Sequence, residues 1–73
     1  MKTVNDLISA FGGPTKFAEA MGFKHPSTAS EMQRRESIPV KYFPKIVEEA
    51  RSRGIKGVTV QRLVEIHASN AAA

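Results

Sequence analysis

The chain has 73 residues, of which 41% are hydrophobic and 25% are charged, and it contains no cysteine. This composition is typical of one ordinary globular domain, and it excludes an intrinsically disordered chain as well as disulfide and thiolate chemistry. Eleven Lys and Arg residues against seven Asp and Glu residues give a net charge of +4, which favours a polyanionic partner.

The apolar spacing predicts an all-α fold, a compact bundle of about five short helices without a strand. The first helix is indicated by four apolar side chains at helical spacing, Val4, Leu7, Ile8 and Phe11. Thr3 or Asn5 is expected to cap the N-terminus of this helix, and Gly12 and Gly13 end it.

A second helix is expected to begin at Pro14, because the missing N–H of proline would be unpaired in the first turn in any case. Gly22 ends this helix, and Phe23 is expected to be a buried plug in the turn that follows. The inner face of the helix is expected to consist of Phe17, Ala18 and Met21.

Pro26 marks the start of a third helix, with His25 or Ser27 as its cap and with Ala29 and Met32 towards the core. The following Ser-Ile-Pro sequence at residues 37–39 breaks the helical pattern. A regular helix is then expected over about residues 44–53, after a helical turn over residues 39–43. Its apolar face consists of Tyr42, Phe43, Ile46, Val47 and Ala50, which we interpret as core rather than base-stacking residues.

A last helix is expected after a short connector that Gly54 and Gly57 flank, with Thr59 as its cap. Its inward side chains are predicted to be Val60, Leu63, Val64 and His67. Residues 1–69 are therefore expected to form a single domain, and residues 70–73 a frayed tail.

Residues 14–35 predict a helix-turn-helix, a unit whose second helix lies in the DNA major groove. Short hydroxyl side chains on that second helix let its backbone approach the groove, and arginines bind phosphate or guanine through two parallel hydrogen bonds. Basic residues also gather nearby, since residues 24–45 carry five basic and two acidic side chains, +3 of the total charge.

The candidate DNA contacts fall into two groups. Base contacts are expected from five residues of the third helix, Ser27, Thr28, Ser30, Glu31 and Arg34. Phosphate contacts are expected from Thr15, Lys16, Lys24, His25, Arg35 and Lys41. Two alternatives stay open: Glu31 either accepts from a cytosine amino group or pairs with Arg35 four residues later, and the arginines either bind DNA or only satisfy the helix dipole.

The same segment resembles the helix-turn-helix of the Cro and lambda-repressor-like superfamily of phage and bacterial regulators. The resemblance is carried by Ala18, by Gly22 four residues later, and by the Ser-Thr-Ala-Ser sequence at residues 27–30. The Ser-Ile-Pro sequence and the helix after it also resemble small prophage-type regulators and the YdaS-like antitoxin group. One residue more than in the superfamily separates Gly22 from Ala29, which changes the side chains that face the groove.

The resemblance implies a regulator that binds double-stranded DNA as a homodimer. The last helix is expected in the dimer contact, because residues 58–66 have more apolar side chains than one side of a terminal helix can bury: Val58, Val60, Leu63, Val64 and Ile66. We expect a transcriptional repressor that acts by occupying a promoter. Two alternatives are an antitoxin, which would also bind a toxin protein, and a helical protein-interaction module that does not bind DNA.

The sequence does not indicate an enzyme. It has one aspartate, Asp6, and its two histidines, His25 and His67, have no carboxylate spaced to complete a catalytic triad or a metal site. A glycine-rich phosphate loop is also missing, so we expect no cofactor and no metal. Because the N-terminus lacks a long apolar run, we expect no signal peptide, no membrane association and a cytoplasmic location.

Overall fold

The computed structural model describes residues 2–72, and the side chains of residues 2–68. Its elements are α1 (Val4–Ala10), α2 (Pro14–Met21), α3 (Pro26–Arg35), the 3₁₀ helix η1 (Val40–Tyr42), α4 (Phe43–Ser52) and α5 (Val60–Ala72). No strand occurs in this part of the chain, so the predicted all-α bundle of five helices is confirmed. The radius of gyration of 11.0 Å agrees with about 11 Å for a compact chain of this length.

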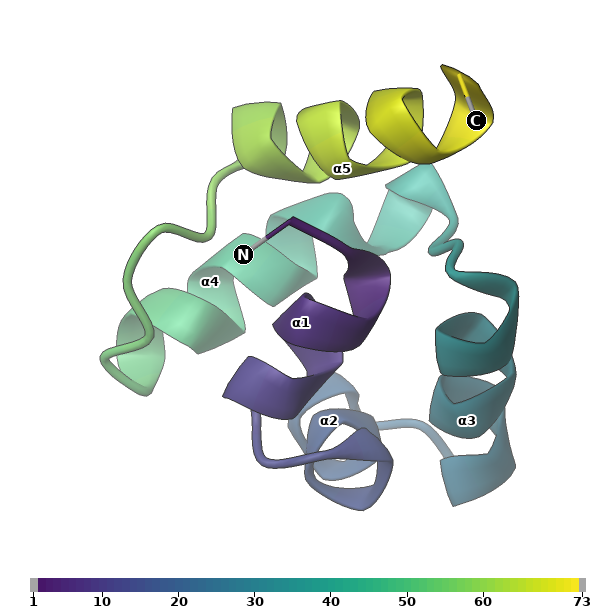
Figure 1. Cartoon of the computed structure of the whole chain (residues 1–73). Helices are drawn as coiled ribbons and strands as arrows, with labels where there is room; N and C mark the ends of the chain where they lie inside the picture. Colours follow the sequence, from purple (N-terminus) through teal and green to yellow (C-terminus); the bar gives the residue numbers. More distant parts are fainter. Residues whose placement is uncertain (1, 73) are drawn as a thin grey trace.

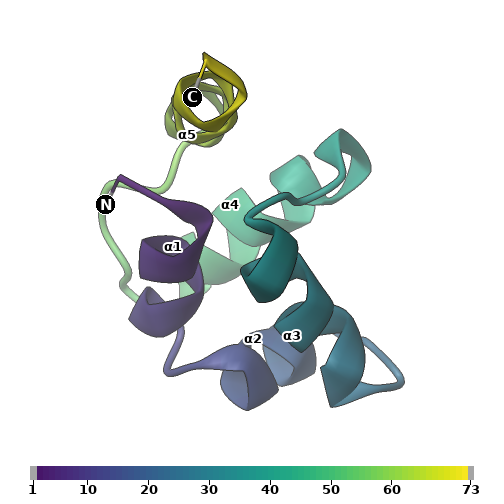
Figure 2. The same ribbon diagram turned by 45° about the vertical axis from the view of Figure 1, so that its right-hand side comes forward.

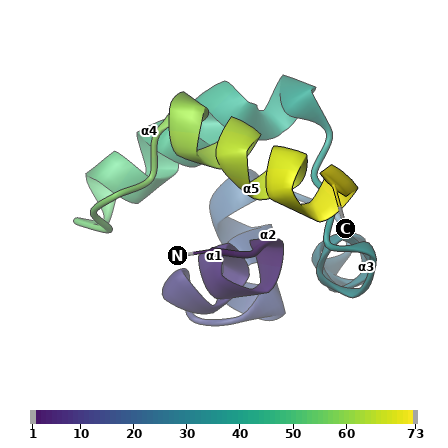
Figure 3. The same cartoon turned by 45° about the horizontal axis from the view of Figure 1, so that its top comes forward.

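Two groups of helices make up the molecule. Helices α2 and α3 pack against each other at one end, and α5 lies across α4 at the other end (Figure 1). In the two turned views, α3 still lies next to α2, and α5 still lies next to α4 (Figures 2 and 3). Helix α1 contacts both α2 and α3, and it therefore supports the first pair.

The N-terminus of α1 resolves the choice between Thr3 and Asn5 in favour of Thr3. The Thr3 hydroxyl accepts a hydrogen bond from the Asp6 N–H at 3.0 Å, and the Asp6 carboxylate accepts from the Thr3 N–H at 3.2 Å. This reciprocal pair is a capping box. The Lys2 N–H also donates to Asp6 at 2.9 Å, and this bond is the main cause that holds the pKa of Asp6 below its ordinary value.

The turn between α2 and α3 is set by a glycine and a proline. Gly22 adopts a left-handed conformation with φ of 73°, which ends α2, and Pro26 occupies the first position of α3. His25 is in the N-cap position of α3, although its side chain makes no capping hydrogen bond. Phe23 is only half-buried rather than fully buried, because its ring lies at the edge of the core between Phe17 and Tyr42.

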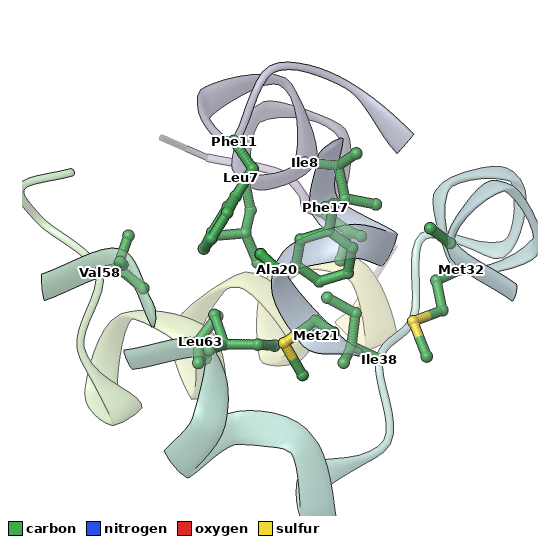
Figure 4. Packing of buried hydrophobic residues seen from close by; sticks show 14 of the residues in the cluster. Leu7, Ile8, Phe11, Phe17, Ala20, Met21, Met32, Ile38, Val58 and Leu63 are labelled. Atoms are coloured by element: carbon green, nitrogen blue, oxygen red, sulfur yellow. The ribbon is translucent and has the colours of Figure 1, made fainter. Parts of the chain in front are cut away.

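The core contains side chains from every α-helix and from the loops. Leu7, Phe17, Ile46 and Leu63 are completely buried, and they come from α1, α2, α4 and α5. Figure 4 shows labelled residues of α1, α2 and α5 that converge on one centre, with Met32 and Ile38 beside them. The inner faces predicted for α1, α2 and α3 are all buried, and Ala20 joins them.

The inward face of α5 agrees only in part with the prediction. Leu63 and Ile66 are buried and His67 is half-buried, whereas Val60 and Val64 are 49% and 51% exposed. The His67 ring accepts a hydrogen bond from the Ile38 N–H, so His67 lies inward as predicted. Thr59 caps α5 as predicted, accepting from the Arg62 N–H at 3.0 Å.

The end of α5 falls in the segment for which the sequence predicts a frayed tail. Its helical backbone continues to Ala72, and Ala73 lies outside the described residues. No helix in residues 2–72 is long and apolar enough to cross a membrane.

Candidate nucleic-acid interface

Helix α3 has an inner and an outer face of different chemistry. Ala29 and Met32 are buried, and the Gln33 amide donates to the Asn5 side chain of α1, so these residues anchor the helix to the bundle. Ser30 and Arg34 are exposed on the opposite side. The helical period thus separates an apolar anchor from a polar surface, as the sequence predicts.

A cleft of about 530 Å³ runs along one side of α3, and we call it the α3 cleft. Its second wall consists of residues that follow the left-handed turn at Glu36, which has a φ of 51°. The Ser37 N–H donates to the Met32 carbonyl at 3.2 Å and fixes this turn. The residues that line the cleft include Ser27, Thr28, Glu31 and Arg35 of α3, with Lys41 and Tyr42 opposite.

Glu31 is the centre of the charge pattern on α3. Its Oε1 lies 2.8 Å from Nε of Arg35, and the same oxygen accepts from Nη2 of Arg34. The hydrogen bond from Arg34 is the main cause that holds the pKa of Glu31 below its ordinary value, and the positive charges of both arginines add to it. The predicted Glu31–Arg35 pair is therefore confirmed, and Arg34 shares it.

Both arginines remain accessible in spite of these pairs. The Arg34 and Arg35 side chains are 73% and 70% exposed. Ion pairs with this exposure contribute little to stability, since water screens the charges. A polyanion that approaches α3 can therefore recruit either guanidinium without unfolding the helix.

The wall of the cleft opposite α3 contains Tyr42, whose ring packs against another aromatic ring. The Tyr42 ring packs edge-to-face on Phe23, with 5.3 Å between ring centroids, and the Lys41 ammonium lies 5.2 Å from the centre of the Tyr42 ring. Phe43 is buried, as its core assignment predicts, while Tyr42 is half-buried and also borders the cleft. This packing holds Lys41 on the rim.

The predicted contact residues are all on the surface or half-buried. The six predicted phosphate contacts are exposed, as are Ser27, Ser30 and Arg34, while Thr28 and Glu31 are half-buried. The cleft brings together five of these eleven residues, Ser27, Thr28, Glu31, Arg35 and Lys41. The remaining six lie outside its lining, in the first turn of α2, in the turn before α3 and on the outer face of α3.

His67 is a residue whose structural role the sequence did not reveal. Its Nε2 accepts from the Ile38 N–H at 2.9 Å, and its Nδ1 lies 2.7 Å from the Leu63 carbonyl. Because a backbone N–H can only donate, Nε2 carries no proton and Nδ1 donates. His67 thus ties α5 to the segment that forms the second wall of the cleft. A polar residue on an apolar helical stripe was the available sign that it needs a partner.

The side chains that the structure describes include no group of three or more His, Asp and Glu residues placed to hold a metal ion. Comparison with known proteins found no matching family model, no matching curated protein and no matching solved structure. The likeness of residues 14–39 to Cro-like regulators therefore rests on the residues quoted above for it.

Proposed function

We propose that the protein binds double-stranded DNA through α3 and regulates transcription by occupying a promoter. The observation that carries the proposal is the outer face of α3, where exposed hydroxyls and arginines stand on a helix anchored by Ala29 and Met32. A protein-interaction helix would be expected to expose apolar side chains there instead.

The dimensions of α3 support an approach to the major groove. The helix has ten residues and is therefore about 15 Å long. The groove is about 12 Å wide and admits one α-helix. Ser27 and Ser30 add little bulk to the outer face, so the helix backbone can come close to the base edges.

Phosphate contacts are proposed on both sides of α3. Lys24 and His25 precede the helix, and Arg35 and Lys41 lie on the α3 cleft beside its C-terminal half. Exposed Thr15 and Lys16 stand in the first turn of α2, where backbone N–H groups favour an anion.

A homodimer is proposed as the active form. One helix of this length reads too few base pairs to be selective, and small DNA-binding domains therefore use paired half-sites. Val60 and Val64 of α5 are half exposed on one helical side and are the proposed dimer contact, whereas Leu63 is fully buried and belongs to the core. The operator is then expected to hold two half-sites about 34 Å apart.

The proposal is tested by the salt dependence of binding to random duplex DNA. Replacing both Arg34 and Arg35 by Ala should flatten the slope of log K against log[salt] by about 1 for each lost phosphate contact. A matched double variant at Arg51 and Arg62, which are exposed on α4 and α5, should keep the slope of the wild type. An absence of DNA binding at low salt would instead favour the protein-interaction module.

A further inference from the structure

The negative charge of Glu31 would be repelled by DNA phosphates if α3 entered a groove. Glu31 is the one acidic residue in the sequence of α3, and its side chain is 43% exposed on the helix surface. A carboxylate between two phosphate strands is repelled unless it accepts hydrogen bonds. The two ion pairs of Glu31 both use Oε1, so Oε2 takes part in neither of them.

The base edges of the major groove offer few donors to that second oxygen. Cytosine presents its N4 amino group, and adenine presents N6 beside the acceptor N7, which repels a carboxylate. Cytosine is therefore the base that best suits Oε2. The guanine paired with it presents O6 and N7, the acceptors that an arginine binds with two parallel bonds.

We infer that Glu31 determines base specificity, with Oε2 accepting from a cytosine amino group while Oε1 keeps Arg34 directed at a guanine. This inference rests on the proposed function of α3. The guanidinium of arginine has five N–H donors, so the one bond from Arg34 Nη2 to Glu31 leaves four for DNA. Arg35 stays held by the same oxygen on the side of the cleft, and from there it would contact a phosphate.

The pairing also predicts discrimination against random DNA. While Glu31 holds both arginines, their charges are partly neutralised, and binding of any phosphate strand is weakened. A cytosine at the right position adds a hydrogen bond to Oε2, while both arginines keep their bonds to Oε1. Cytosine should accordingly be preferred over the other bases at that position by about 5- to 150-fold.

The inference is tested by selecting bound sequences from a random duplex pool with the wild type and with Glu31→Gln. A glutamine amide pairs with N6 and N7 of adenine, so the variant should replace the selected cytosine by adenine at one position of each half-site. It should also bind random duplex more tightly than the wild type, because both arginines lose their partner. Glu49→Gln is the matched control, since Glu49 pairs with Arg53 at 3.3 Å on α4, and it should select the wild-type sites.

Three results would overturn the inference. If Glu31→Gln, shown by circular dichroism to be folded, selects the same base as the wild type at every position, Glu31 does not determine specificity. If the wild type binds duplex DNA but selects no cytosine, the inference fails and the proposed DNA binding stands. If the wild type binds no duplex DNA, both fall together.

Discussion

At the scale of single residues, the outer face of α3 is made of side chains that differ greatly in reach. Ser27 and Ser30 are short and exposed, while Arg34 is long and exposed. Short hydroxyls contact only what the helix backbone itself approaches, whereas an arginine reaches across the groove. Substitutions of the serines therefore test which side of α3 faces the bases, and substitutions of the arginine test the contribution of its positive charge.

Replacing Ser27 or Ser30 by Ala should relax the preference at one or two base pairs of the operator by about 1–3 kcal/mol each. Affinity for random duplex should change little, because no cationic contact is lost. Ser52→Ala, at the exposed end of α4, is the matched control and should bind like the wild type. Survival of the preferred operator in both serine variants would show that another side of α3 faces the bases.

Much of the residue-level picture could be predicted because the helical period is local. Alternation of buried Ala29 and Met32 with exposed Ser30 and Arg34 follows from 3.6 residues per turn. The sharing of one Glu31 oxygen by two arginines could not be predicted, since it depends on side-chain rotamers rather than spacing.

At the scale of elements, the ends of the helices could be predicted from the sequence, whereas the inward face of α5 could be predicted only in part. Thr3, Pro14 and Gly22 act on backbone groups within four residues, so their sequence positions suffice to place the ends of α1 and α2. On α5, Ile66 is buried, whereas Val60 and Val64, which were expected inside, are half exposed. Apolar spacing alone cannot distinguish Val64 from Ile66, because the choice depends on contacts with distant segments, such as the bond between His67 and Ile38, 29 residues apart.

The bond from Ile38 to His67 should stabilise the fold measurably. His67→Phe keeps a ring beside Phe43, whose centroid lies 5.3 Å from that of His67, but leaves the Ile38 N–H without its acceptor. The free energy of unfolding should fall by about 1–3 kcal/mol, and the Ile38 amide should exchange faster with solvent. His25→Phe, at an exposed position, is the control and should change stability by less than about 0.5 kcal/mol. Unchanged exchange at Ile38 in the His67 variant would contradict the role of this bond.

At the scale of the whole molecule, the α3 cleft arises from two segments of the chain, α3 and the residues from Ser37 to Tyr42. Arg35 and Lys41 were both expected to contact phosphate, but their common cleft depends on the turn at Glu36 and on the Tyr42 ring packed on Phe23. Both features require the folded bundle, so spacing along the chain could not reveal them. The net charge of +4, in contrast, follows from composition alone and already favours a polyanion.

The central claim, that α3 is the surface on DNA, is tested most directly by following backbone amide signals in NMR while duplex DNA is added at low salt. We expect the largest shifts in α3 and at residues 37–41, with small shifts at Gly54 and Gly57 in the connector before α5. If saturating DNA leaves the α3 amides unshifted, whether other helices respond or none does, α3 is not the surface that binds DNA.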